Sequence, residues 1–208
     1  MPRKNLIRTG VFPYHVCARS NNREWFYAPL AKVWETFEEY LCKIQDVHGV
    51  DIHAFVLMSN HFHLLISTPQ SNLDSAMLYL MREVCRSINR SSNRINHLFG
   101  GPYKWSVIYS AFKYDHALKY VYRNPVKAQL CQFVEDYPYS SLKKGAFKVS
   151  QSTLATLRAG LPEIDRLRWL NEPYSPEEDD CVRRALRRRE FKITPVNGRK
   201  NLPFELME

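Results

Sequence analysis

Two histidines stand one residue apart in the apolar stretch AFVLMSNHFHLLIS, residues 54–67. In a β-strand, residues two apart point to the same face, so His61 and His63 would project together while Phe62 and Leu64 face the core. Two imidazoles on one face supply half of a divalent metal site. Two histidines spaced in this way, with nothing else to support a site, are more often exposed residues of an edge strand. A strongly apolar strand, however, gives little reason for two such residues together. The stretch therefore predicts a metal site.

A second pair, Tyr120 and Asn124, offers a reacting group and a further ligand. Four residues apart, the two share one face of a predicted helix. Beside the histidine strand, that helix could present the Asn124 carbonyl oxygen to a metal and the Tyr120 hydroxyl to a substrate. Taken alone, Asn124 is better interpreted as ending the helix, because Pro125 disfavours helical geometry at the residue before it. His116 shares the stripe and could assist proton transfer, but it is left out of the catalytic set.

These residues are positioned by a predicted α+β fold. Apolar periodicity predicts strands over 10–20, 50–58, 61–67 and around 105–109, and helices over 28–49, 71–94 and 113–131. Ser59 and Asn60 separate two of the strands as a tight hairpin. The order β-α-β-β-α-β-α predicts an antiparallel sheet with helices packed on a face.

The chain divides into two parts on composition. Residues 1–145 hold the predicted α+β domain, and residues 146–208 form a basic C-terminal helical extension with a tail. Its helix begins at Ser175, and Glu178 completes a capping box. Acidic residues crowd the first turn and arginines the last, which matches the helix dipole. The arginine run is therefore not by itself evidence of DNA contact.

Net charge indicates the class of binding partner, and the cysteines indicate the cellular compartment. A formal net charge of +9 over 208 residues favours a polyanionic partner, usually nucleic acid. Five scattered cysteines without a CxxC pair fit a reducing cytoplasm rather than a disulfide framework or a cysteine zinc site. Neither a signal peptide nor a membrane span is predicted. We expect a soluble, cytoplasmic protein with no membrane partner.

Candidate DNA contacts lie on two helices and one strand. Several arginines lie toward the C-terminal ends of the two helices, where they could either contact DNA phosphates or simply be solvated: Arg82, Arg86, Arg90, Arg187 and Arg188. Trp105 and Tyr103 could stack on an unpaired base. For Trp105 an ordinary core position is slightly preferred.

Four segments carry a resemblance to a known family. MSNHFHLLI (58–66) resembles the His-hydrophobic-His signature of the HUH single-strand DNA nucleases, and LKYVYRNPVKAQL (118–130) resembles the catalytic segment of their single-tyrosine transposases. With YHVCARSNNREWF (14–26) and VEDYPYSS (134–141), residues 10–145 resemble the REP-associated tyrosine transposases, bacterial proteins tied to repetitive extragenic palindromes. Ser20 departs from the glycine that usually follows the arginine. The resemblance implies a ferredoxin-like HUH nuclease core.

The resemblance also implies a reaction and the residues that perform it. Tyr120 would attack a single-stranded DNA phosphodiester, giving a 5′-phosphotyrosine link and a free 3′-hydroxyl. His61 and His63 would be metal ligands, and Asn124 would stand where relatives place a polar third ligand. The ion would be Mg²⁺ or Mn²⁺, of which Mn²⁺ tolerates imidazole better.

The implied partner is single-stranded hairpin DNA of the REP type, bound by a monomer in the bacterial nucleoid, with a dimer still open. A replication-initiator-type nickase is disfavoured by the single-tyrosine Asn-Pro-Val segment. A non-catalytic hairpin DNA- or RNA-binding protein on a transposase scaffold also remains open. Intact His61, His63 and Tyr120 argue against it. The hairpin sequence, the cleavage site and the role of the extension do not follow from the sequence.

Overall fold

The computed structural model describes residues 5–95, 97–143, 145–150 and 161–193. The strands are β1 (Tyr14–Arg19), β2 (Asp51–Leu57), β3 (His61–Ser67) and β4 (Lys104–Val107). The helices are α1 (Leu30–His48), α2 (Leu73–Ser91), α3 (Ala111–Lys127), α4 (Glu163–Asn171) and α5 (Pro176–Ala185), with short 3₁₀ turns at Asn21–Arg23 and Val134–Asp136. The predicted order of elements up to α3 is confirmed.

The four strands form one antiparallel sheet in the order β2-β3-β1-β4. This is the order of a ferredoxin-like fold, in which two βαβ halves interleave their strands. β2 and β3 form the predicted hairpin, where the Met58 N–H donates to the His61 carbonyl at 2.8 Å. The interleaving places β1 at the centre, between β3 and β4. Cys17 therefore lies opposite both His63 and Lys104.

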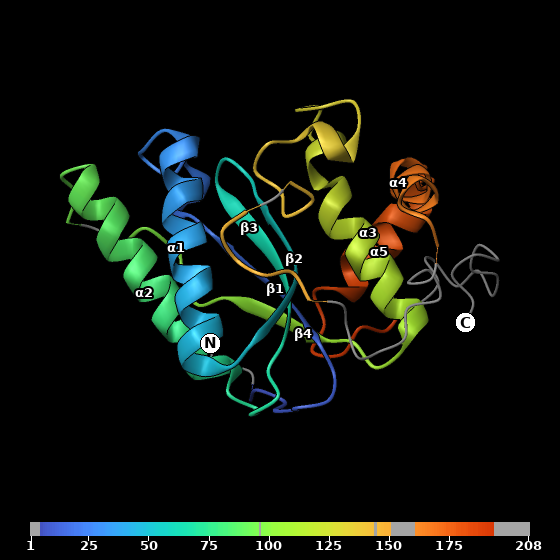
Figure 1. The fold of residues 1–208 in the computed structure, drawn as a ribbon, viewed down its shortest axis with the longest axis horizontal. Coiled ribbons are helices and arrows are strands. Elements are labelled where there is room, and N and C mark those ends of the chain that lie inside the picture. The colour runs from blue at the N-terminus through green and yellow to red at the C-terminus, as the bar shows by residue number, and fades with distance from the viewer. Residues whose placement is uncertain (1–4, 96, 144, 151–160, 194–208) are drawn as a thin grey trace.

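Helices cover both faces of this sheet (Figure 1). α1 and α2 pack on one face against Val16, Phe62 and Leu64. α3 and α5 pack on the other face against Val56 and Leu65. The α+β class is confirmed, but the helices do not pack on a single face. The near-continuous apolar runs of β2 and β3 explain the difference, because a strand buried on both sides needs apolar residues at successive positions.

α3 continues through the residue that was expected to end it. The helix contains both Asn124 and Pro125 and ends at Lys127, so the interpretation of Asn124 as a helix terminus is wrong. A proline removes one N–H donor from a helix, here the bond to the carbonyl of Val121, but α3 is packed on both sides of that position, since Val121 and Pro125 are buried. The Asn124 side-chain amide donates to the Tyr120 carbonyl oxygen at 2.7 Å. Asn124 therefore keeps its place one turn beyond Tyr120.

The extension packs beside α3 and contains a helix, α4, that the sequence did not predict. The capping box of α5 is confirmed, since the Glu178 N–H donates to Ser175 Oγ at 3.2 Å and the Ser175 N–H to Glu178 Oε2 at 2.7 Å. The buried Lys119 ammonium lies 4.9 Å from the Trp169 ring centroid and 4.8 Å from that of Tyr174. These cation–π contacts join the extension to α3. The predicted tail after residue 193 lies outside the described residues.

After α5 the chain returns to the sheet. The Val107 N–H donates to the Arg189 carbonyl, and the Phe191 N–H donates to the Val107 carbonyl, each at 2.8 Å. This short pairing beside β4 holds residues 187–191 near the face that α3 covers. Across the described ranges, no helix is long and apolar enough to cross a membrane.

Candidate active site

Polar residues of β1 and β3 share the face of the sheet that α3 covers. Side chains alternate along a strand, so His15, Cys17 and Arg19 of β1 project to one face. Because Cys17 pairs with His63 and Arg19 with His61, both histidines of β3 project to that face as well. The ring centroids of His61 and His63 are 5.1 Å apart. The prediction that these two imidazoles lie together is confirmed.

Both imidazoles are held in the neutral form. Burial lowers the pKa of His61 to about 4, and the charge of Arg19 acts in the same direction. Burial also holds the pKa of His63 well below its usual value, with smaller effects from His15 and His61. A neutral imidazole keeps a lone pair, which is the form that binds a metal ion.

A third histidine, to which the sequence assigned no role, completes the cluster. His15 Nε2 lies 2.8 Å from His63 Nδ1, and the two rings stack with centroids 5.1 Å apart. Burial lowers the pKa of His15 to about 3. The two-residue period of β1 places His15 on the same face as Cys17. Its proximity to His63 results from the pairing of β1 with β3, which cannot be predicted from the local sequence.

Tyr120 meets this cluster from α3. Its ring is edge-on to those of His63 and His15, with centroid distances of 5.6 and 6.2 Å. Tyr122, the nearest competing tyrosine, is buried and its hydroxyl lies 3.1 Å from Ser141 Oγ. Of these two tyrosines, Tyr120 is therefore the one beside the histidines.

The Tyr120 hydroxyl is harder to ionise than a free tyrosine. Burial raises its pKa to about 12, and Cys17 and Asp179 act in the same direction. The charges of Arg187 and Arg183 act in the opposite direction. Both arginines belong to the extension, which therefore supplies positive charge that favours the ionised form of this hydroxyl.

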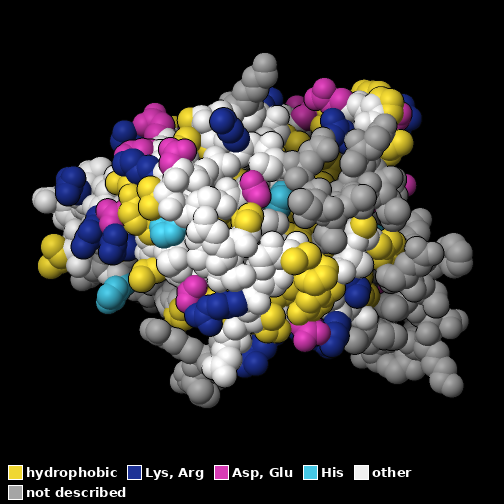
Figure 2. Space-filling view, turned by 60° about the horizontal axis from the view of Figure 1, so that its bottom comes forward, with side chains coloured by type: hydrophobic (Ala, Val, Ile, Leu, Met, Phe, Trp, Pro, Cys, Tyr) yellow, Lys and Arg dark blue, Asp and Glu magenta, His cyan; other side chains and the backbone are white. Residues whose placement is uncertain are grey.

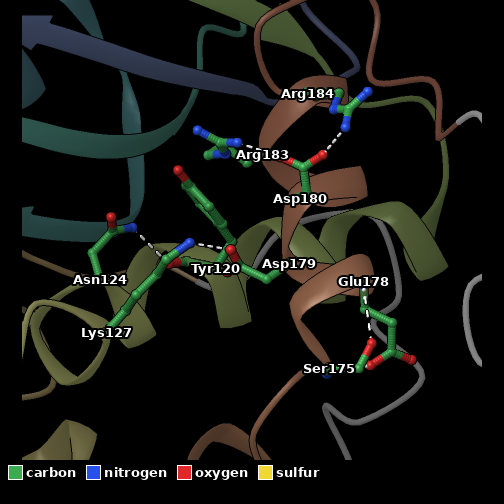
Figure 3. A network of polar contacts seen from close by, with 9 residues as sticks. All are labelled: Tyr120, Asn124, Lys127, Ser175, Glu178, Asp179, Asp180, Arg183 and Arg184. Carbon is green, nitrogen blue, oxygen red and sulfur yellow. Dashed lines mark hydrogen bonds and ion pairs between the residues drawn. The ribbon is translucent and has the colours of Figure 1, made fainter. Parts of the chain in front are cut away.

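Tyr120 and Asn124 line a pocket of about 450 Å³ between α3 and α5. α5 contributes Asp179, Asp180 and Arg183 to the lining. Figure 3 shows the Tyr120 ring extending from α3 toward the side on which Arg183 projects from α5. The extension thus forms one wall of the pocket next to Tyr120.

Ion pairs hold that wall in place. Lys127 at the end of α3 pairs with Asp179 of α5 (Figure 3). Asp180 pairs with both Arg183 and Arg184, and its hydrogen bonds to these two arginines lower the pKa of its carboxyl to about 2. Arg183 therefore lines the same pocket as Tyr120 while its guanidinium is paired with the Asp180 carboxylate.

Three basic residues surround Cys17 on the histidine face, and we call Arg19, Lys104 and Arg187 the basic patch. Burial raises the pKa of the Cys17 thiol to about 11, whereas the charges of these three residues oppose that shift. All three are exposed. Arg187 was among the predicted DNA contacts. Arg19 and Lys104 were missed, although the two-residue period from Cys17 marks Arg19.

The arginines predicted on α2 lie on the opposite side of the sheet (Figure 1). Arg82 and Arg86 both contact the Glu83 carboxylate, at 2.7 and 3.2 Å. Arg90 is exposed near the end of α2, and Arg188 is exposed after α5. The α2 arginines are not brought together with Tyr120. On the face drawn in Figure 2, Lys and Arg side chains lie in small groups among Asp and Glu. The charges on this face therefore do not form one continuous positive surface for DNA.

The two aromatic residues predicted to stack on a base pack against the α1–α2 side. Trp105 is half-buried and meets Tyr14 edge-on, with ring centroids 6.5 Å apart. Tyr103 is likewise half-buried against that core. This placement agrees with the core position preferred for Trp105.

Trp25, which the sequence left without a role, is 76% exposed. Its loop is tied to the turn that precedes His61, because the Phe26 N–H donates to the Ser59 carbonyl at 3.3 Å. The Asn60 side-chain amide also donates to the Arg23 carbonyl at 2.7 Å. The loop that carries this exposed indole therefore adjoins the His61 end of β3. The segment NNREW marks a turn but gives no sign of which strand end it meets.

The described residues include no group of three or more His, Cys, Asp or Glu side chains arranged to hold a metal ion. His61 and His63 supply two imidazoles, so a third protein ligand would have to be of another type. The Asn124 amide oxygen is a ligand of another type. The bond to the Tyr120 carbonyl is made by the Asn124 nitrogen and does not use this oxygen. Two neutral imidazoles and an amide oxygen fit a divalent ion that keeps positions open for substrate and water.

Known proteins resemble this chain in sequence and in fold. The model of the family described as "Transposase IS200 like" matches residues 11–129. A REP-associated tyrosine transposase of Escherichia coli (strain K12) is 22% identical over 143 residues, which cover 68% of this chain and 82% of the relative. A solved REP-associated tyrosine transposase bound to a REP hairpin matches with a TM-score of 0.54 at 19% identity, covering 74% of this chain and 95% of that one. At this identity the structural match supports the fold alone.

Proposed function

Since the chain belongs to the IS200-like transposase family, we propose that it cleaves and rejoins single-stranded DNA at hairpin-forming repetitive palindromes through a covalent 5′-phosphotyrosine intermediate. One observation carries the proposal: the Tyr120 ring lies 5.6 Å from that of His63, centroid to centroid, on the histidine face of the sheet. The REP hairpin bound by the solved relative supports the choice of substrate.

In the proposed reaction, Tyr120 Oη forms a bond to phosphorus as the bond from phosphorus to the 3′ oxygen breaks. The proton lost from the tyrosine hydroxyl is matched by one gained at the 3′ oxygen. The covalent link keeps the phosphodiester energy for joining to another end. Arg187 and Arg183 favour the phenolate, which partly offsets the burial that raises the pKa of Tyr120 to about 12.

We propose that His61 and His63 hold a Mg²⁺ or Mn²⁺ ion, with Asn124 as a third ligand. The bound ion would polarise the scissile phosphate and orient it toward the tyrosine. Imidazole ligands favour Mn²⁺ over Mg²⁺, which prefers oxygen donors. The low pKa values of both histidines support this assignment, because neither must lose a proton at neutral pH.

The DNA strand would approach along the histidine face. The basic patch lies on that face and offers three positive charges to the backbone near the scissile phosphate. The exposed indole of Trp25 offers a surface on which an unpaired base could stack. Arg82, Arg86, Arg90 and Arg188 remain proposed contacts for the hairpin stem. The α2 members could reach only a part of the hairpin that extends to the other side of the sheet.

We further propose a monomer associated with the bacterial nucleoid, because net positive charge favours DNA and one chain holds both the histidines and Tyr120. A second function, hairpin binding without cleavage, is favoured by one observation. Tyr120 is half-buried beside α5, and burial raises its pKa to about 12. Cleavage and binding therefore have to be measured separately.

The proposed function is tested by following both ends of a cleaved strand. A single-stranded hairpin carrying the host's palindromic repeats is labelled at its 5′ end or at its 3′ end and incubated with Mn²⁺ or with EDTA. We expect a shorter 5′-labelled product with a free 3′-hydroxyl, and a 3′-labelled product bound to protein, only with Mn²⁺. Tight binding of the hairpin without either product would favour the binding protein instead.

A further inference from the structure

Each of the two proposed metal ligands has its Nδ1 atom engaged by a neighbour. His61 Nδ1 lies 2.7 Å from Asn60 Oδ1. The other end of the Asn60 amide donates to the Arg23 carbonyl at 2.7 Å, which fixes the nitrogen there and the oxygen toward His61. An amide oxygen can only accept a hydrogen bond. His61 therefore carries its proton on Nδ1, and its Nε2 keeps the lone pair.

His63 is engaged in the corresponding way by His15. His63 Nδ1 and His15 Nε2 are 2.8 Å apart, and both residues are buried. His15 pairs with Leu65 in the strand register, so its ring reaches diagonally to His63 rather than facing it directly. A hydrogen bond between two neutral imidazoles needs one donor and one acceptor. If His63 donates from Nδ1, its Nε2 has a free lone pair like that of His61.

We propose that His15 and Asn60 are positioning residues that hold His63 and His61 as Nδ1–H tautomers, with both Nε2 atoms open to a divalent cation. The inference rests on the proposed function, because the cation is the one assigned to His61 and His63. A partner at the second ring nitrogen fixes the tautomer and the orientation of a ligating histidine. His15 and Asn60 reach the two ligands from different elements, β1 and the β2–β3 turn.

The competing explanation is that His15 and His63 merely satisfy each other in a buried sheet. Two pairs of substitutions separate the explanations. His15→Phe keeps a ring but removes the acceptor, whereas His15→Gln keeps an acceptor. Asn60→Ala removes the acceptor for His61, whereas Asn60→Asp keeps it. His53→Gln is the control, since His53 is a buried histidine of the adjacent strand β2 that bonds Ser67 Oγ at 2.8 Å.

The first measurement is the ¹⁵N NMR spectrum of histidine-labelled protein in EDTA at neutral pH. Wild type should show a protonated Nδ1 and an unprotonated Nε2 for both His61 and His63. His15→Phe should convert the His63 signals to a mixture of tautomers without changing those of His61. Asn60→Ala should do the converse, and the control should change neither. A wild-type His63 protonated at Nε2 would overturn the inference.

The second measurement is Mn²⁺ affinity by calorimetry, with thermal unfolding to verify that each variant folds. His15→Phe and Asn60→Ala should each weaken Mn²⁺ binding by about 10- to 100-fold, and His15→Gln and Asn60→Asp should recover most of the loss. Unchanged affinity in folded His15→Phe and Asn60→Ala would overturn the inference while leaving the metal site in place. If wild type bound no Mn²⁺, the proposed metal site would fail and the positioning roles with it.

Discussion

The Tyr120 ring of α3 stands edge-on to the His63 ring of β3, with centroids 5.6 Å apart and ring planes at 86°. This contact exists because α3 packs on the histidine face through Ala117 and Val121, both fully buried. A helix on the other face could not bring a tyrosine to His63. The packing of α3 thus joins the proposed nucleophile to the proposed ligands.

Removing charge from the basic patch should weaken hairpin binding and its dependence on salt. In Arg19→Gln/Lys104→Gln, the plot of log K against log salt concentration should become less steep by about 0.7 for each lost phosphate contact. Fluorescence anisotropy over a salt series measures the slope. Arg82→Gln/Arg86→Gln removes the same charge from α2 and is the comparison. Its slope should change less, because both arginines already contact the Glu83 carboxylate. A larger change in the α2 variant than in the basic-patch variant would place the main DNA contact on the opposite side of the sheet.

Truncating the exposed indole should cost affinity for the single-stranded part of the substrate. Trp25→Ala should lose about 1–3 kcal/mol of binding free energy, the range for base stacking on an aromatic side chain. Leu78→Ala is the control, because Leu78 is also exposed but lies on α2. Binding of the hairpin with and without its flanking single strand measures the effect. Equal losses with both ligands would contradict a stacking role for Trp25.

Metal should stabilise the fold through His61 and His63. A ligand at one hundred times its Kd raises the free energy of unfolding by about 2.7 kcal/mol. Saturating Mn²⁺ should therefore raise the Tm of the wild type in scanning calorimetry, and EDTA should reverse the rise. His61→Gln/His63→Gln should show no such response. A rise of equal size in that variant would mean that Mn²⁺ binds elsewhere.

The stability of the metal-free protein should fall as pH is lowered below about 6.5, the usual pKa of histidine. His53 is buried between the Ser150 carbonyl and Ser67 Oγ, and burial lowers its pKa. The unfolded chain therefore takes up a proton that the folded protein resists, at up to about 1.4 kcal/mol per pH unit. Urea unfolding in EDTA at two pH values measures the loss.

His53→Gln should make that loss smaller without removing it, since His15, His61 and His63 act in the same direction. The exposed His97 gives the control, and His97→Gln should leave the loss unchanged. An identical loss in wild type and His53→Gln would show that His53 does not stay neutral in the folded protein.

Local periodicity was enough to predict the elements that carry the chemistry. The apolar alternation of 61–67 placed His61 and His63 on one face, and the four-residue spacing placed Tyr120 beside Asn124. The resemblance to REP-associated tyrosine transposases is confirmed by the family match and by the Escherichia coli relative. These signals lie within single segments, where one strand or one helix turn fixes the relative directions of side chains.

The missed residues depend on pairing between distant segments. His15, Arg19 and Lys104 join the site only because β1 pairs with both β3 and β4. The loop of Trp25 comes near the site only because it is bonded to the turn before His61. Asn124 was misjudged for the opposite reason. The local rule for a residue before proline predicted a helix end, but the packed helix continues past Pro125.

The most direct test of the proposed nuclease mechanism is the capture of its covalent intermediate. Wild type, Tyr120→Phe and Tyr122→Phe are incubated with labelled hairpin DNA and Mn²⁺ and separated on a denaturing protein gel, with EDTA as the metal-free control. We predict a labelled adduct in wild type and in Tyr122→Phe, its loss in Tyr120→Phe and in EDTA, and a DNA-linked peptide that contains Tyr120 by mass spectrometry. An adduct that persists in Tyr120→Phe, or no adduct on a tightly bound hairpin, would contradict the assignment of Tyr120 as the nucleophile.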